Sequence, residues 1–102
     1  WNNDNEGKIK ITGGNISSKL STTIYNKGGG TVEISGDTTN ISSENNNIIG
    51  NTTTGKIDIK GGTIETTSGR AIQNNGIVNI SDGVINGCTT GTNPVIWNTM
   101  EL

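Results

Sequence analysis

Residues 55–74 read GKIDIKGGTIETTSGRAIQN and contain one complete structural repeat. After the opening glycine, Ile57 and Ile59 alternate with charged residues, and such alternation is typical of a half-buried β-strand. A second apolar segment follows at Ile64, and the stretch closes on the tripeptide Ile72–Asn74. The pattern predicts three short strands in one repeat.

The same segments recur along the whole chain. The strand-opening glycines lie 23, 25 and 21 residues apart, at Gly7, Gly30, Gly55 and Gly76. A period of this length indicates a solenoid, and parallel crossovers favour a right-handed connection. We therefore predict one all-β domain over residues 1–102, a three-sided right-handed parallel β-helix of about four coils of 21–25 residues each. In the second coil, residues 37–40 predict a two-residue bulge or a longer corner.

Equivalent apolar positions of successive repeats fall into four columns. Neighbouring coils lie about 4.8 Å apart, so each column becomes a stack of interlocking β-branched side chains. Burying each such side chain contributes about 1.5–3 kcal/mol. The four predicted inward columns are Ile9, Val32, Ile57 and Val78; Ile11, Ile34, Ile59 and Ile80; Ile16, Ile41, Ile64 and Ile85; and Ile24, Ile49, Ile72 and Ile96.

A fifth column consists of asparagines that end each third segment. They recur at intervals of 24, 25, 23 and 24 residues, at Asn2, Asn26, Asn51, Asn74 and Asn98. A side-chain amide can donate to the amide above it and accept from the amide below it. Stacked asparagines therefore predict a structural hydrogen-bonded ladder.

Composition excludes several classes of function. The net charge of -2 argues against nucleic acid, because phosphate binding needs clustered Lys and Arg. No apolar run approaches the roughly 20 residues that cross a membrane, so we expect no membrane insertion. The chain has no His, which excludes His-based nucleophilic triads. The single Cys, Cys88, lacks an activating partner and is expected to be inert. We expect no cofactor.

Two carboxylates on the outward face of the first strand form the candidate metal site. Glu33 and Asp58 share a column, and carboxylates in contact are ligands for a hard cation such as calcium. Glu65 is a further acidic candidate, and the cationic residues predicted nearby are Lys8, Lys10, Lys56 and Arg70. The alternative, which we favour, is a solvated face of mixed charge in which ion pairs contribute about 0.2–1 kcal/mol each.

Aromatic residues of the third segment form a second candidate site. Tyr25, Gln73 and Trp97 occupy one outward column with Gly50, and Trp1 lies at the same position one coil earlier. Aromatic rings beside amide groups make a platform on which a sugar ring can stack. The alternative is that Trp1 and Trp97 cover exposed core or a neighbouring molecule.

Three segments of the sequence resemble those of a known family. Residues 61–64 (GGTI), 70–76 (RAIQNNG) and 78–85 (VNISDGVI) resemble the degenerate repeats of large secreted bacterial surface proteins of the pectate-lyase-like superfamily. This resemblance implies an extracellular or cell-surface setting. It specifies a coil rather than an activity, because the family includes lyases, polysaccharide binders, adhesins and stalks.

These observations lead to one expected function and two alternatives. We expect a non-catalytic structural or adhesion module, acting as a rigid spacer or self-assembling unit, and forming a slice of a longer solenoid or a stacking unit. Its partners would be neighbouring coils or further copies end to end, since a solenoid end exposes unpaired backbone groups. The alternatives are a polysaccharide-binding module and a truncated polysaccharide lyase-like enzyme.

Overall fold

The computed structural model describes residues 2, 6–87 and 95–98, and the regular structure of these residues is entirely β. No described segment forms a helix of the length and apolarity that a membrane span requires. The strands are β1 (Lys8–Ile11), β2 (Gly14–Ser18), β3 (Ile24–Asn26), β4 (Thr31–Ile34), β5 (Thr39–Ser43), β6 (Ile49–Asn51), β7 (Lys56–Thr66), β8 (Ile72–Asn74), β9 (Ile77–Asn86) and β10 (Ile96–Asn98).

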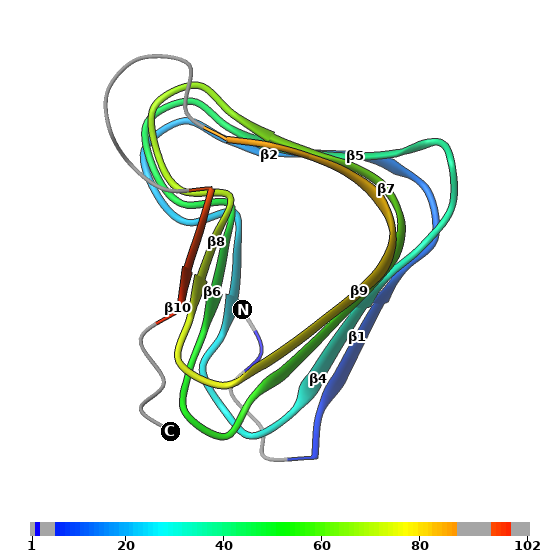
Figure 1. Cartoon of the computed structure of the whole chain (residues 1–102), viewed down its shortest axis with the longest axis vertical. Helices are drawn as coiled ribbons and strands as arrows, with labels where there is room; N and C mark the ends of the chain where they lie inside the picture. Colours follow the sequence, from blue (N-terminus) through cyan, green and yellow to red (C-terminus); the bar gives the residue numbers. More distant parts are fainter. Residues whose placement is uncertain (1, 3–5, 88–94, 99–102) are drawn as a thin grey trace.

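The strands stack as a parallel β-solenoid of about four coils, which confirms the predicted fold class. A six-stranded sheet has the order β1-β4-β7-β5-β2, with β9 paired to β7, and a four-stranded sheet has the order β10-β8-β6-β3. Each pair of described strands is parallel and joins a strand to its counterpart in the next coil. Viewed along the stack, the coils superpose around a common interior (Figure 1).

The division of each coil into three separate strands holds only in the first two coils. In the third and fourth coils the first two predicted segments run together as β7 and β9, and both segments belong to the six-stranded sheet. Gly62 and Gly83 have φ angles of 90° and 116°. Glycine adopts this conformation without steric cost, so the chain bends inside the strand, and after a register shift at the bend the pairing of β7 with β9 resumes at Thr63 and Val84. Three separate sides and a right-handed turn stay predictions.

The second coil has the longer corner that the spacing predicted. Residues 37–38 form a turn between β4 and β5, and Gly36 has a φ of 91°. The Thr39 amide donates to the Gly36 carbonyl at 3.1 Å, while the Thr39 hydroxyl donates to the Ser35 carbonyl at 2.6 Å. The corner bulges outward (Figure 1), and strand register is regained at β5.

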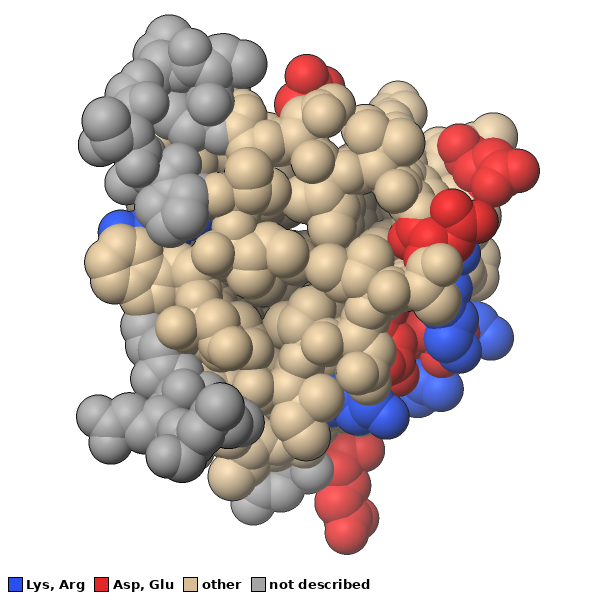
Figure 2. Space-filling model, viewed as in Figure 1, with Lys and Arg blue, Asp and Glu red and all other residues tan. Residues whose placement is uncertain are grey.

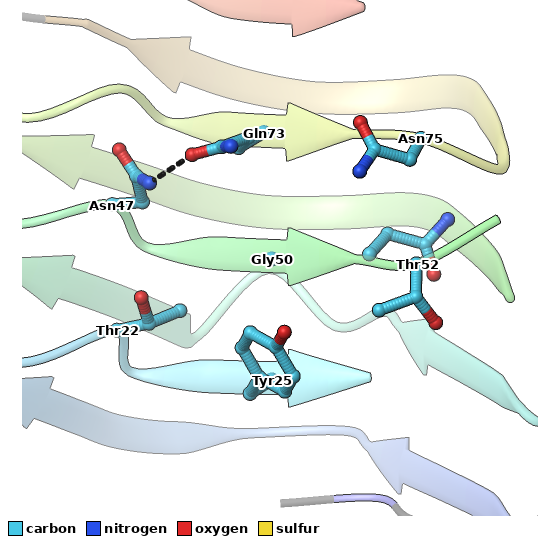
Figure 3. Close-up of a pocket in the computed structure, with 8 residues that line it drawn as sticks. Thr22, Tyr25, Asn47, Gly50, Thr52, Gln73 and Asn75 are labelled. Atoms are coloured by element: carbon cyan, nitrogen blue, oxygen red, sulfur yellow. Dashed lines mark hydrogen bonds between the residues drawn. The ribbon is translucent and has the colours of Figure 1, made fainter. Parts of the chain in front are cut away.

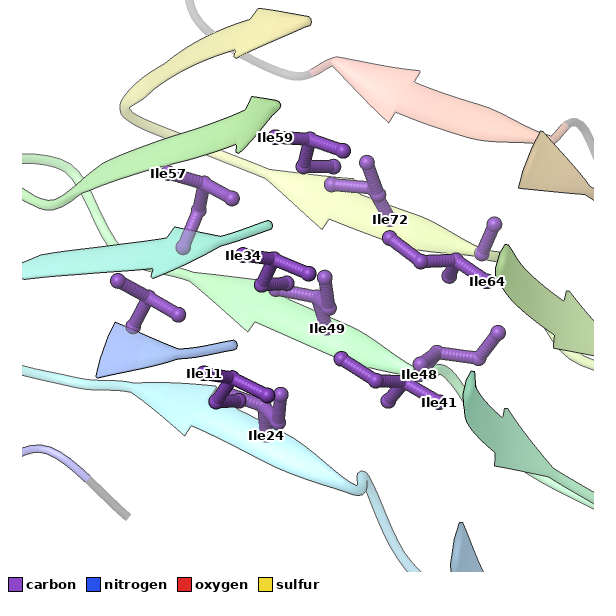
Figure 4. Close-up of a cluster of buried hydrophobic side chains, with 12 residues drawn as sticks. Ile11, Ile24, Ile34, Ile41, Ile48, Ile49, Ile57, Ile59, Ile64 and Ile72 are labelled. Atoms are coloured by element: carbon purple, nitrogen blue, oxygen red, sulfur yellow. The ribbon is translucent and has the colours of Figure 1, made fainter. Parts of the chain in front are cut away.

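All four predicted inward columns are confirmed by the strand register. Figure 4 shows Ile11, Ile34 and Ile59 in one row facing Ile24, Ile49 and Ile72 across the interior. The core also includes Ile48 and Ala71, both fully buried. The repeat pattern did not predict these two, because residue type varies along their column, from Thr23 through Ile48 and Ala71 to Val95.

Burial weakens in the last coil. Ile80 is 43% exposed although Ile59, one coil earlier in the same column, is 1% exposed. Ile96 is 40% exposed although Ile72 is fully buried. The apolar columns therefore extend to the surface at β9 and β10.

Hydroxyl groups shape the corner that leads into the smaller sheet. Ser18, Ser43 and Thr66 each accept a hydrogen bond from the backbone amide three residues later, at 3.3, 3.2 and 3.1 Å. Ser and Thr favour such local turns. The three residues lie at equivalent positions in successive coils, so every described corner of this kind aims the third strand in the same direction.

Candidate functional site

The predicted asparagine ladder is present and runs along the inner side of the smaller sheet. The Nδ2 of Asn2, Asn26 and Asn51 donates to the Oδ1 of the next asparagine at 2.9, 2.9 and 2.8 Å. The last step, from Asn74 to Asn98, measures 3.2 Å. Every step has the same direction, with the donor always on the lower-numbered coil.

The ladder also holds the turn that follows each third strand. The Nδ2 groups of Asn26, Asn51 and Asn74 donate to the carbonyls of Gly30, Gly55 and Gly76 at 2.8, 2.9 and 2.9 Å. These three asparagines are at most 4% exposed, and buried polar groups need such partners. The ladder is therefore structural.

Ion pairs occupy the outward face of the larger sheet. The predicted register Lys10, Glu33, Asp58, Asn79 is confirmed, but Glu33 pairs with Lys8 at 3.2 Å and with Lys60 at 3.5 Å. Figure 2 shows charged side chains gathered on the side where β1 and β4 lie in Figure 1. Lys60, which the sequence interpretation left out, is therefore a principal partner of Glu33.

Lysines determine the electrostatics of this face. A hydrogen bond from Lys8 holds the pKa of Glu33 below its usual value, and the nearby charges of Lys60 and Lys10 act in the same direction. Asp58 pairs with Lys56 at 3.6 Å and accepts a hydrogen bond from Asn79 at 3.2 Å.

The calcium prediction for Glu33 and Asp58 stays a prediction. The two residues are in register on adjacent strands, and each carboxylate already faces a lysine ammonium group. Within the described ranges, no group of three or more His, Cys, Asp or Glu side chains is arranged to hold a metal ion. Binding would require calcium to compete with the lysines.

Arg70 and Glu65 lie apart from this face, although the sequence interpretation placed them near the carboxylates. The guanidinium carbon of Arg70 lies 4.0 Å from the ring centroid of Trp97, a cation–π contact. Glu65 is in register with Ser42 on the second half of β7. Neither residue contributes to the column of Glu33 and Asp58.

The outward column of the smaller sheet contains Tyr25, Gly50, Gln73 and Trp97, as predicted. A groove with a cavity volume of about 120 Å³ lies over it. We call it the amide groove. Its lining residues are Thr22, Tyr25, Asn47, Gly50, Asn51, Thr52, Gln73 and Asn75. Trp1 and Cys88 lie outside the described residues.

Glycine and amide contacts shape the amide groove. A Cβ atom at Gly50 would lie 3.1 Å from Cδ2 and 3.3 Å from Cε2 of Tyr25, so the tyrosine ring packs over Gly50. Asn47 Nδ2 donates to Gln73 Oε1 at 2.6 Å (Figure 3), and the Arg70 backbone amide donates to Asn47 Oδ1 at 3.2 Å. These contacts fix the Gln73 side chain on the other side of Gly50 from the tyrosine.

A second hollow, of about 210 Å³, lies at the bend of the larger sheet. Its lining includes the glycines at 61, 62 and 83 and the carboxylates Asp37 and Asp82. Asp82 already accepts a hydrogen bond from the backbone amide of Gly83 at 2.8 Å. This hollow has no aromatic lining residue.

Neither protein-family models, nor characterised proteins, nor solved structures give a match to this chain. A functional conclusion therefore has to rest on the fold and on the contacts described above.

Proposed function

We propose that the chain is a non-catalytic structural and adhesion module of an extracellular bacterial surface protein, a rigid spacer or a self-assembling unit. Coil-to-coil register is the observation that carries this proposal. Core positions stack Ile or Val on Ile or Val, and asparagine stacks on asparagine. The extracellular bacterial setting rests on the likeness of the repeats to those of the pectate-lyase-like superfamily.

Two kinds of hydrogen bond support rigidity. Parallel backbone pairing joins each described strand to its neighbours, and the asparagine ladder adds a side-chain connection along the stack. In a solenoid each repeat is stabilised by its neighbours. A load along the stack would therefore be shared between backbone and side-chain bonds.

Exposure at β9 and β10 supports stacking on a further coil. Ile80 and Ile96 continue columns that are buried in the preceding coils. Another coil of the same architecture would bury these side chains, with a gain of roughly 25 cal/mol per Å² of apolar surface. That coil would come from the same protein or from a second copy.

The test combines an assembly measurement with an activity measurement. Light scattering across a concentration series, with electron microscopy of the same samples, should show unbranched assemblies that grow with concentration. Incubation with polygalacturonate should release no unsaturated product. Turnover that disappears in Glu33→Gln and Asp58→Asn would instead assign a lyase-like enzyme, and particles that stay monomeric at all concentrations would remove self-assembly.

A further inference from the structure

The smaller sheet extends one position farther along the stack than the larger sheet does. Each apolar column of the larger sheet has one member in each of the four coils. The ladder has one asparagine more, and its members are Asn2, Asn26, Asn51, Asn74 and Asn98. The additional member is Asn2, which lies against β3 through an isolated parallel bridge to Asn26.

Backbone and side-chain hydrogen bonds hold Asn2 in that place. Its Nδ2 donates to Asn26 Oδ1 at 2.9 Å and to the Gly7 carbonyl at 3.1 Å. Its backbone amide donates to the Tyr25 carbonyl at 2.8 Å, and its carbonyl accepts from the Lys27 amide at 2.7 Å. Asn2 therefore occupies the outer edge of β3, where a further strand of the smaller sheet would pair.

The two ends of the stack differ in the apolar surface that they expose. Ile11 and Ile24 in the first coil are 9% and 5% exposed. At the other end of the same two columns, Ile80 and Ile96 are 43% and 40% exposed. Asn2 lies against the outer edge of β3, whereas no described strand pairs with the outer edges of β9 and β10. The last coil is therefore the open end.

The register determines how a second copy of this chain can continue the stack. Its β1 and β2 would pair with β9, as each described strand of the larger sheet pairs with its counterpart. On the smaller sheet, one position then remains between Asn74 of the first copy and Asn26 of the second. Two asparagines are available for that position, Asn98 of the first copy and Asn2 of the second. Only one of them fits, so head-to-tail stacking requires the other to leave.

Strand β10 has more to hold it in the shared position than Asn2 has. All of β10 is in register with β8, which lies beside it (Figure 1), and the Arg70 guanidinium lies 4.0 Å from the Trp97 ring. Ile96 would also lie beneath Ile24 of the second copy and continue a buried column. Because burial of apolar surface is favourable, β10 keeps its place and Asn2 of the second copy is displaced.

We propose that Asn2 caps the first coil and is displaced by β10 of a second copy when two chains stack head to tail. Asn98 Nδ2 then donates to Asn26 Oδ1 of the second copy, the bond that Asn2 makes in the free chain. The ladder stays continuous, with every donor in the same direction. This inference rests on the proposed self-assembly, and it adds the polarity of stacking and the contact that restrains it.

The cap acts as a restraint because it must leave before the second copy can bind. A chain whose binding-competent state is rarely populated binds with an apparent affinity reduced by that population. Asn2 therefore raises the concentration at which chains assemble. Weaker binding of Asn2 should favour assembly, and weaker binding of Asn98 should oppose it.

The same substitution at the two ends of the ladder should have opposite effects on assembly. Asn2→Ala removes the side-chain bonds of the cap to Gly7 and Asn26, so the concentration at which assembly begins should fall by about tenfold. Asn98→Ala removes the donor that replaces Asn2, so that concentration should rise by about tenfold. Light scattering across a concentration series measures both effects, and circular dichroism verifies that each variant is folded.

The polarity of stacking can be measured with disulfide bonds. In a Cys88→Ser background, Lys10→Cys and Asn79→Cys introduce thiols three coils apart in one outward column. That separation is about 14 Å, too far for a disulfide within one chain. Head-to-tail stacking brings position 79 of one copy beside position 10 of the next, so oxidation should link the chains into a covalent series. Each single-cysteine variant is a matched control and should stay unlinked.

The outcomes separate this inference from the proposed self-assembly. If Asn2→Ala and Asn98→Ala shift assembly in the same direction, or leave it unchanged, the cap is overturned and self-assembly stands. Covalent dimers of the Asn79→Cys single variant would show that two last coils meet, which overturns head-to-tail stacking. If the unmodified chain and Asn2→Ala both stay monomeric at all concentrations, the inference fails together with self-assembly, and only the rigid-spacer role remains.

Discussion

Two polar columns run along this solenoid, one inside the smaller sheet and one outside the larger sheet. In the inner column, Asn26, Asn51 and Asn74 are nearly inaccessible and bond to one another and to glycine carbonyls. In the outer column, Glu33 and Asp58 meet exposed lysines at 3.2–3.6 Å. Both columns fix register, but a buried amide without a partner costs far more than an exposed ion pair contributes. Because of its burial, the asparagine column is therefore expected to matter more for the stability of the fold than the outer column.

The largest expected effect comes from removing one amide from the middle of the ladder. Asn51→Ala removes one of the two acceptors of Asn26 Nδ2, and it removes the donor to Asn74 Oδ1 and to the Gly55 carbonyl. We expect a loss of about 2–4 kcal/mol in the free energy of unfolding, measured by urea denaturation.

Asn98→Ala is the matched control, because Asn98 ends the described ladder and is exposed. Its expected loss is at most about 1.5 kcal/mol. Equal losses in the two variants would show that burial does not distinguish positions along the ladder.

An intermediate effect is expected when all the ladder asparagines remain but an added atom occupies the space beside them. A Cβ atom at Gly55 would collide with Asn51 Oδ1 and lie 2.6 Å from Asn26 Nδ2. Overpacking of this kind typically costs about 1–3 kcal/mol, so Gly55→Ala should be destabilised by that amount. Hydrogen exchange of the asparagine side-chain amides should quicken at the same time.

Gly13→Ala provides the comparison for that variant. The nearest atom to its added Cβ would be Thr38 Oγ1, at 3.4 Å, so the free energy of unfolding should change by less than about 0.5 kcal/mol. If Gly55→Ala changed the free energy of unfolding as little as Gly13→Ala, the ladder asparagines would be able to shift without loss of stability. The presence of the asparagines would then matter more for stability than their exact positions.

The smallest effect is expected in the outer column. Because the folded pKa of Glu33 is lowered, its ion pairs stabilise the protein at pH values above the usual glutamate pKa, and this stabilisation is lost as pH falls through the lowered value. Glu33→Gln should flatten the acid limb of a stability–pH profile, and high salt should shrink the difference.

Glu65→Gln makes the same chemical change where no described residue forms an ion pair with the carboxylate. Its profile should follow that of the unmodified chain more closely than Glu33→Gln does. An acid limb that is unchanged in Glu33→Gln would contradict the role assigned to Lys8 and Lys60.

The sequence predicted the columns because a column needs only spacing. Ile-x-Asn recurs at nearly constant intervals, so the Ile24 and Asn26 columns follow from counting. Ile48 and Ala71 were missed, because they precede that tripeptide at a corner where residue type varies. The continuity of β7 was also missed, since a pair of glycines is compatible both with a loop between two strands and with a bend within one strand.

In the candidate sites, too, residue spacing predicted the columns but not the side-chain contacts. The register of Tyr25 with Gln73 was predictable, but the Asn47 contact that fixes Gln73 joins a corner to a strand of the next coil. Lys60 was missed for a related reason, because it reaches Glu33 diagonally across the sheet. Side-chain direction, which spacing does not encode, decides both contacts.

The common direction of the ladder bonds gives the solenoid an electrical polarity. Each primary amide carries a dipole much like that of a peptide group, about 3.5 D, and here the dipoles point the same way along the stack. Backbone pairing in a sheet largely cancels its own dipoles, so the asparagines leave a net moment, positive toward Asn98 and negative toward Asn2. Two such stacks meeting head to tail would attract one another, and two meeting head to head would repel.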